Sequence, residues 1–273
     1  MNLKKVTAFI GSQQKRLTYR AVQEFETNLK SLGEVQFEYV FLKDYRLEFC
    51  KSCCMCFEKG EDSCPLKDDR DALLKKIYGS DGVIIATPNY SFQVSAQVKN
   101  LLDRMSFVLH RPRFFGKTFT AVVAQGMFGG KKIQKYLQTI AGNWGFRPVD
   151  GCTVRALGPA DTRDEIKLAR TVKKASARFY KELTRPAPAV PSLFRLMIFR
   201  LARKSIQNLQ NEKFRDYRYY RDNGWFTSDY YYGVPLGIFK KLAGALFDLM
   251  GRILFRSSGE KGLHSPEIKP VRR

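Results

Sequence analysis

The residues with the clearest chemical potential in this chain are its cysteines, because five of the six lie within the fifteen residues from 50 to 64. Cys50, Cys53 and Cys56 are each separated by two residues, which lets one short loop direct three thiolates at a single centre. Cys64, followed by a proline, would supply the fourth thiolate of a [4Fe–4S] cluster. The spacing therefore predicts Cys50, Cys53, Cys56 and Cys64 as cluster ligands. Cys54 is out of phase and is predicted to be a spare thiol.

Two alternatives to a cluster stay open on the sequence alone. The loop could stay reduced and metal-free, folded over a neighbouring ligand, or it could hold zinc. Zinc sites more often use two separated Cys-x-x-Cys pairs or histidines, and the only histidines here are His110 and His264. With only two histidines, the chain offers few candidates for a general acid or base, and we predict no catalytic side chain. Cys152 stands alone in an apolar run and is predicted to be a small buried residue.

Three further segments carry residues suited to a ligand, each directly after an apolar run. In Gly11–Thr18, a strand-to-helix turn would offer free backbone N–H groups to a phosphate, with hydroxyls from Ser12 and Thr18. In Thr87–Phe92, Pro88 is followed by amide, phenol, hydroxyl and phenyl groups that suit a planar ring. Gln125–Gly130 has three glycines in five residues, which let the backbone approach a ligand. Each segment could instead be an ordinary turn, the first with Thr18 as helix cap.

Strands and helices alternate regularly around these segments. Apolar strand-like runs are expected at 4–11, 35–41, 82–87, 118–124 and 146–156, and helices at 18–32, 68–78, 94–108, 131–142 and 162–184. Continuous apolar strands between helices indicate a parallel sheet covered on both faces. No Gly-x-Gly-x-x-Gly follows the first strand, which argues against a dinucleotide-binding Rossmann domain. We predict an α/β, flavodoxin-like, doubly wound fold with a five-stranded parallel sheet in the order 2-1-3-4-5. All three segments then meet at the carboxyl ends of the strands, where such folds bind FMN.

A proline-rich stretch, 185–191, predicts a boundary between two parts of the chain. We expect a flavodoxin-like domain over 1–185, including a Cys-rich loop at 45–67, and a helical extension over 186–273. The extension holds 16 basic and 7 acidic residues, and the whole chain has a formal net charge of +22, which favours anionic partners. Helices are expected at 193–209 and, as a basic amphipathic helix, at 235–256.

The partner of this extension is open on the sequence. Packing against its own protein is the favoured interpretation, ahead of peripheral membrane contact through 235–256. Nucleic-acid binding by the interleaved aromatic and basic residues of 217–232 is the least favoured. No run of about 18 apolar residues predicts a membrane span, and no signal-peptide pattern precedes the first strand. The chain is therefore expected to be cytoplasmic, with its cysteines reduced.

Several motifs taken in order resemble the NADPH-dependent FMN reductase family, and more closely its iron–sulfur flavoprotein branch. They are Gly11-Ser12…Thr18, the cysteine run through Cys64-Pro65 with Asp68-Asp69, Thr87-Pro88-Asn89-Tyr90, and Val94–Asn100 with Asp103-Arg104. The resemblance covers about residues 3–183. It departs from the family after Gly11-Ser12, where the usual proline and arginine are missing and the loop is one residue short.

The resemblance implies bound FMN, NAD(P)H as co-substrate, and a homo-oligomer. It assigns the FMN phosphate to Ser12, Gln14 and Thr18. The ring falls to Pro88, Asn89, Tyr90 and Ser91, with Phe92 in the same loop. Gln125, Gly126 and Gly129 would close the ring's other side. The expected function is an FMN-dependent NAD(P)H oxidoreductase that passes electrons to an unknown acceptor, through a [4Fe–4S] cluster if one is present. The alternative is a cofactor-free basic scaffold that binds nucleic acid or an anionic membrane.

Overall fold

The computed structural model describes residues 3–155, 161–185 and 188–255, and the chain divides into two compact units. The first unit comprises Met1–Cys53 and Cys64–Pro188, and the second comprises Cys54–Ser63 and Ala189–Arg273. The division after Pro188 lies close to the boundary expected at 185. The middle of the Cys-rich loop, however, groups with the C-terminal unit.

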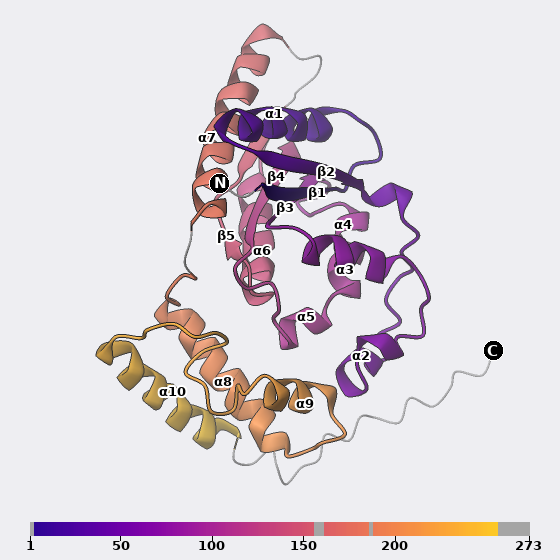
Figure 1. Ribbon diagram of the computed structural model, residues 1–273. Coiled ribbons are helices and arrows are strands. Elements are labelled where there is room, and N and C mark those ends of the chain that lie inside the picture. The colour runs from indigo at the N-terminus through magenta and orange to yellow at the C-terminus, as the bar shows by residue number, and fades with distance from the viewer. Residues whose placement is uncertain (1–2, 156–160, 186–187, 256–273) are drawn as a thin grey trace, which may run out of the picture. The chain divides into compact units, whose positions relative to one another are not determined.

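The first unit is built on a parallel sheet with the strand order β2-β1-β3-β4-β5, which confirms the flavodoxin-like prediction (Figure 1). Its strands are β1 (Lys4–Ile10), β2 (Val35–Phe41), β3 (Gly82–Pro88), β4 (Thr118–Gln125), β5 (Arg147–Pro148) and β6 (Cys152–Arg155). β3 and β4 are buried along their whole length, as expected for central strands that helices cover on both faces.

The fifth position of the sheet differs from the prediction, because the strand expected at 146–156 is broken into β5 and β6. Both pieces pair with β4, Pro148 with Phe119 and Cys152 with Val122. The fifth position therefore advances four residues where β4 advances three, which is a bulge. Gly151 lies in the bulge, and a Cβ there would stand 1.8 Å from the carbonyl oxygen of Ala121. Only glycine lets the two backbones approach this closely.

The third strand was expected to end at residue 87, yet β3 continues through Pro88, which lies opposite Ala124. The backbone N–H of the next residue, Asn89, donates to the Ala124 carbonyl at 2.7 Å. Neighbouring N–H groups point to opposite sides of a strand, so the N–H that Pro88 lacks would face β1. The pairing with β1 has already ended at Ala86, and the proline therefore costs the sheet no hydrogen bond.

Two helices cover one face of the sheet, α1 (Leu17–Leu32) and α7 (Thr162–Leu183), and bury Phe25 and Phe179 against each other. The other face carries α3 (Arg70–Tyr78), α4 (Ala96–Arg104) and α6 (Gly130–Asn143) (Figure 1). The helix expected at 94–108 is divided into α4 and the short α5 (Phe107–His110). It starts late because the backbone N–H of Ser95 donates to the Thr87 hydroxyl at 3.0 Å, which holds Ser95 at the end of the loop.

The Cys-rich loop is more ordered than predicted. It follows a short 3-10 helix, η1 (Leu42–Asp44), and contains α2 (Met55–Glu58) and η2 (Glu61–Ser63). α2 packs against α9 (Arg215–Asp222) of the C-terminal unit, where a Cβ on Gly60 would lie 3.5 Å from the Arg215 side chain. This packing explains why residues 54–63 belong to the second unit.

The rest of the C-terminal unit comprises α8 (Leu193–Leu209), α9 and α10 (Ile238–Phe255). α8 has the bounds expected at 193–209 and α10 lies within the helix expected at 235–256, whereas α9 was not predicted. The aromatic residues between α8 and α10 pack on one another, with edge contacts from Trp225 to Tyr220 at 4.9 Å and to Tyr231 at 4.7 Å. The Trp225 indole N–H donates to the Tyr231 carbonyl. These aromatics form a small core within the C-terminal unit. Among the described helices, none combines the length and the apolar character needed to cross a membrane.

Candidate functional site

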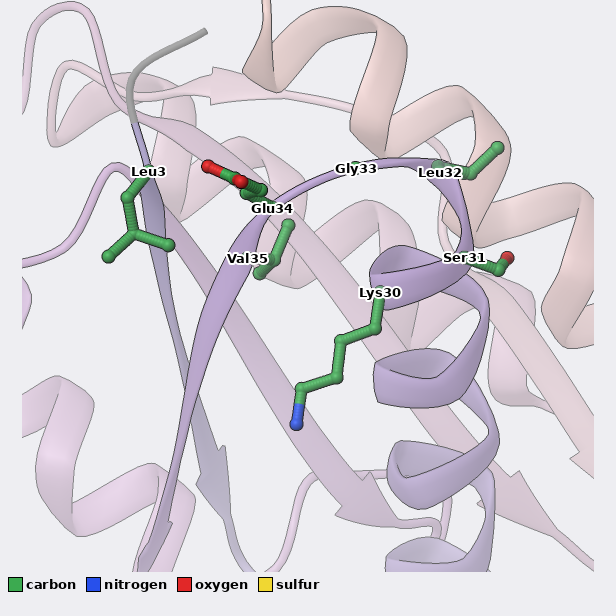
Figure 2. A pocket seen from close by; sticks show the side chains of 7 residues that line it. All are labelled: Leu3, Lys30, Ser31, Leu32, Gly33, Glu34 and Val35. Carbon is green, nitrogen blue, oxygen red and sulfur yellow. The ribbon is translucent and has the colours of Figure 1, made fainter.

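The hollow in Figure 2 lies at the wrong end of the sheet for a flavodoxin-like ligand site. It has a volume of about 770 Å³ and is lined by Leu3 and residues 30–35, at the amino ends of β1 and β2. None of the predicted site residues lines it. The predicted site residues instead follow β1, β3 and β4, which are neighbours in the sheet, at the carboxyl ends of these strands.

The loop after β1 turns sharply into α1. The Ser12 hydroxyl donates to the Gln14 carbonyl at 3.1 Å, and the backbone N–H of Arg16 donates to the same oxygen at 2.9 Å. Arg16 is the N-cap, but its side chain makes no capping bond, and the first turn of α1 holds no acidic residue. Thr18 lies inside the helix and is 4% exposed, so the alternative in which Thr18 is the N-cap is wrong. An uncapped first turn without acids is suited to an anion.

The loop after β3 is a tight turn with two consecutive left-handed residues, Ser91 at φ 49° and Phe92 at φ 63°. Tyr90 and Gln93 close it through reciprocal backbone hydrogen bonds of 3.1 and 2.9 Å. Left-handed backbone at non-glycine residues costs free energy and persists only where the surroundings fix it. The turn leaves the rings of Tyr90 and Phe92 about 60% exposed, at 62% and 59%.

The loop after β4 is held by its own polar groups. The Gln125 side-chain oxygen accepts from the backbone N–H of Gly130 at 2.6 Å, and its amide nitrogen donates to the Met127 carbonyl at 3.3 Å. Gly129 has a φ of 102°, and a Cβ there would come within 2.9 Å of the Asn89 amide nitrogen. Gln125 therefore organises the loop, and Gly129 lets the loop approach the residues after β3.

Asn89 joins the two loops. Its side-chain nitrogen donates to the Phe128 carbonyl at 2.8 Å, while its side-chain oxygen is buried without a partner in the described part of the protein. Ser95, just beyond the same loop, also has a buried hydroxyl oxygen without a partner there. A buried polar atom without a hydrogen bond costs about 1 to 3 kcal/mol. These atoms are therefore suited to a polar ligand, and FMN carries both N–H donors and carbonyl acceptors on its ring.

An exposed apolar patch lies beside these atoms. Phe92 and Phe128 stack with their ring centroids 5.5 Å apart, and Phe128 and Met127 are 59% and 61% exposed. Large apolar side chains gathered at the surface mark a surface that a ligand or a partner covers. Met127 and Phe128 were not among the predicted site residues. Two large apolar residues between glycines in a loop were the signal that could have found them.

The ends of the cysteine loop are clamped by a buried ion pair. Arg104 pairs with Asp68, both side chains being at most 2% exposed, and Arg104 also donates to the Glu48 carbonyl at 2.9 Å. Its other nitrogen lies 3.8 Å from the sulfur of Cys64. The Asp68 carboxylate also accepts from the backbone N–H of Glu48 at 2.8 Å. Burial would raise the pKa of Asp68, but the hydrogen bonds from Arg104 and from the backbone N–H groups of Glu48 and Arg70 hold it below its ordinary value.

The same clamp has two outer members. Asn100 donates to the Leu47 carbonyl at 2.7 Å, and Asp69 accepts from the backbone N–H of Arg46 at 2.7 Å. Asp68 and Asp69 therefore join the segment that follows the cysteines to the segment that precedes them.

None of the six cysteines, all of which the structure describes, forms a disulfide. Cys50, Cys53 and Cys54 are exposed, and Cys56 and Cys64 are half-buried. Within the described residues, no three His, Cys, Asp or Glu side chains gather closely enough to hold a metal ion. Four thiols with this spacing suit an iron–sulfur cluster, but the described side chains are not gathered around a common centre. Cys152 is 3% exposed, and burial raises the pKa of its thiol to about 12, which fits an inert core residue.

Residues 4–156 match the profile of the NADPH-dependent FMN reductase family. The chain belongs to this family. An iron–sulfur flavoprotein of Archaeoglobus fulgidus is 28% identical over 226 residues, which cover 81% of this chain and 99% of that protein. A second protein of that name from the same organism is 35% identical over 127 residues, 46% of this chain and 61% of the relative. These relatives support the iron–sulfur flavoprotein branch predicted from the cysteine motif.

A solved structure with the same fold is that of RosB with a bound 8-demethyl-8-formylriboflavin-5'-phosphate intermediate. It superposes with a TM-score of 0.54 at 13% identity, covering 86% of this chain and 92% of RosB, and it supports the fold alone. Family membership identifies the chain as an NAD(P)H-dependent FMN oxidoreductase. The cofactor-free scaffold considered above is thereby disfavoured.

Proposed function

We propose that the chain holds FMN at the carboxyl edge of β1, β3 and β4 and uses it to move electrons from a reduced nicotinamide to an acceptor. The observation that carries this site is the position of Asn89. Its side chain joins the loop after β3 to the loop after β4 by a hydrogen bond, and its side-chain oxygen is buried without a partner in the described part of the protein. The exposed patch of Tyr90, Phe92, Met127 and Phe128 gives an apolar surface of the kind on which a planar ring packs. When bound, FMN would supply the redox chemistry, by accepting a hydride and releasing electrons.

In this proposal the side chains bind and orient the cofactor. Ser12, Gln14 and Thr18, with the first turn of α1, would hold the phosphate, and Pro88–Phe92 with Gln125, Gly126 and Gly129 would enclose the ring. The Asn89 oxygen would accept a ring N–H. The loop after β3 is fixed by its own hydrogen bonds, so little ordering is left for the ligand to impose. No side chain is needed as an acid or base for hydride transfer.

The test is the identity and affinity of the released flavin. The purified protein should release FMN after denaturation and rebind it with quenching of flavin fluorescence, whereas released FAD, or no binding of FMN at micromolar concentration, would refute the site. A double variant, Phe92→Asp with Phe128→Asp, should lose FMN and keep its far-ultraviolet circular dichroism. Retention of wild-type FMN affinity in this variant would move the ring away from these loops.

We further propose that Cys50, Cys53, Cys56 and Cys64 bind one [4Fe–4S] cluster and that Cys54 does not. The spacing of the cysteines and the clamp of Asp68 and Arg104 at the loop ends support this assignment. Such a cluster would deliver electrons to the acceptor one at a time, because clusters pass electrons singly. Protein purified without oxygen should contain about four irons per chain, with broad absorption near 400 nm. Zinc, or no metal, after anaerobic purification and reconstitution would favour one of the other two interpretations of the loop.

A further inference from the structure

α10 is the last helix that the structure describes, and its small residues, instead of its large apolar ones, face the neighbouring helix α8. α10 rests on α8 through small residues, since a Cβ on Gly244 would lie 3.3 Å from the Arg200 guanidinium and one on Gly251 would lie 2.8 Å from Lys204. Its one acidic residue, Asp248, also faces α8. The Asp248 carboxylate accepts from Arg203 at 2.5 and 2.6 Å and from Arg200 at 2.8 Å.

The apolar face of α10 is left uncovered. Seven large apolar side chains recur along it at helical spacing and are between 52% and 80% exposed: Ile238, Phe239, Leu242, Leu246, Leu249, Ile253 and Leu254. An amphipathic helix of a globular protein normally turns this face toward a core. An exposed stripe of this length indicates a surface with a partner.

The charges beside the stripe are all basic. Lys241 and Arg252 are exposed and Lys240 is half-buried, while the carboxylate of Asp248 is engaged by two arginines. α10 therefore presents apolar and cationic groups outward and turns its anionic group inward. A hollow of about 670 Å³ opens at the end of the stripe, lined by Leu249 and Ile253 together with Arg252 and the polar side chains of Asn208 and Gln210.

Charge complementarity selects the partner. Two copies of α10 meeting face to face would bring their lysines and arginines together without an acidic residue on either exposed face to offset them. A surface of anionic lipids offers apolar depth for the stripe and negative charge for Lys240, Lys241 and Arg252, and the net charge of +22 adds long-range attraction. The helix has 18 residues and is about 27 Å long by helix geometry, so it would lie in the interface as a surface helix.

We propose that α10 binds the protein to an anionic membrane surface, with its apolar stripe in the acyl boundary and its flanking cations among the headgroups. This property goes beyond the flavin chemistry and does not depend on it. It makes the enzyme a peripheral membrane protein by way of its C-terminal unit.

The test is flotation of the full-length, FMN-loaded protein with lipid vesicles. The protein should float with vesicles of phosphatidylcholine and phosphatidylglycerol at low salt, bind more weakly as salt rises, and bind poorly to phosphatidylcholine alone. Ile253→Asp should weaken binding by about tenfold or more, because the variant replaces an apolar side chain buried in the acyl boundary with a charged one. Lys241→Gln should weaken it about fivefold, the effect of one basic residue near an anionic surface.

The matched control is Ile166→Asp in α7. Ile166 is as exposed as Ile253, 64% against 68%, so the two variants differ in place and not in chemistry. Ile166→Asp should leave vesicle binding unchanged, and FMN content and circular dichroism should match in all variants. Absence of binding to anionic vesicles, or equal loss in both Asp variants, would overturn the proposal. So would a change in sedimentation mass on Ile253→Asp in a protein that never floats, because the stripe would then bind a second copy.

Discussion

The carboxyl edge of β1, β3 and β4, here called the flavin edge, and the cysteine loop differ in how far their ligand-binding residues are already in place. At the flavin edge, hydrogen bonds from Gln125 and Asn89 and the tight turn after β3 fix the ligand-facing residues on a rigid sheet. In the cysteine loop, Arg104 and Asp68 fix the ends, while the described thiols are not gathered around a common centre. The comparison indicates that FMN would enter a preformed site, whereas a metal centre would have to draw its own ligands together.

The largest expected effect is on iron content, which should distinguish the cysteines that bind the cluster from the one that does not. Cys53→Ser should remove the iron entirely, because three thiolates and a serine hold a cuboidal cluster poorly, and Cys54→Ser should leave iron content unchanged. Iron and sulfide analysis of anaerobically prepared protein measures this, and FMN content serves as the internal control. Equal iron loss in the two variants would show that the ligand set is wrong.

The clamp at the loop ends should matter next. Arg104→Ala leaves the buried Asp68 carboxylate without its cation, and breaking a buried pair costs about 3 to 5 kcal/mol. Urea unfolding followed by circular dichroism measures the loss, and iron content should fall before FMN content does. Asp103→Asn is the control on the same helix, since the exposed pair of Asp103 and Lys99 should change stability by less than about 1 kcal/mol. If FMN is lost first, the clamp belongs to the flavin edge instead.

Acid should act on the clamp in the same direction. Because the folded pKa of Asp68 is lowered, its stabilisation is fully present above the ordinary Asp pKa of about 3.9 and is lost as pH falls through the folded value. Asp68→Asn should therefore be less stable than the wild type near neutral pH, and the difference should shrink below about pH 4. A stability difference that stays constant from pH 6 to pH 3 would refute this role of the Asp68 charge.

A smaller effect is expected at the flavin edge. Asn89→Ala removes the bridge to Phe128 and the acceptor proposed for the ring, so FMN should bind about tenfold more weakly, as for the loss of one or two hydrogen bonds. Fluorescence titration of apoprotein with FMN gives the affinity, and Asn143→Ala, an exposed position at the end of α6, should not change it. An unchanged affinity in Asn89→Ala would mean that the flavin lies elsewhere.

The smallest effect concerns the phosphate. Thr18→Ala should weaken FMN binding by about 1 kcal/mol if the buried hydroxyl reaches the phosphate. Thr27→Ala is matched to it, because Thr27 is exposed on the same helix and its hydroxyl bonds to the Gln23 carbonyl. Riboflavin, which lacks the phosphate, should bind both variants equally. A loss of riboflavin affinity in Thr18→Ala would indicate damage to the helix instead of a lost phosphate contact.

Topology could be predicted from the sequence because it rests on local patterns. The alternation of apolar strands and amphipathic helices predicted the strand order, and α1 ends at Leu32, as the helix expected at 18–32 does. The bulge at Gly151 could not be foreseen, since it depends on how closely Ala121 approaches from β4. The roles of Asp68 and Arg104 were equally hidden, because 36 residues separate them and only the fold brings them together.

The location of the candidate site could also be predicted from the sequence. The ends of β1, β3 and β4 identify the ligand edge, and the motifs after them supply the residues. The amphipathic pattern of 235–256 predicted a helix with an apolar stripe, but not that glycines and Asp248 would face α8 and leave the stripe outward. An amphipathic sequence pattern predicts an apolar stripe on a helix, but which face the helix buries depends on tertiary packing.

The assignment of residues 54–63 to the C-terminal unit makes that unit discontinuous in sequence. The chain passes between the two units at Cys53–Cys54, at Ser63–Cys64 and again at Pro188–Ala189. A cut in the proline-rich stretch would therefore nick the protein without freeing a fragment, because α2 still packs on α9. The C-terminal unit is therefore connected to the rest of the chain at both ends of residues 54–63 as well as after Pro188. Deleting residues 189–273 would remove α9, the helix on which α2 packs in the middle of the cysteine run.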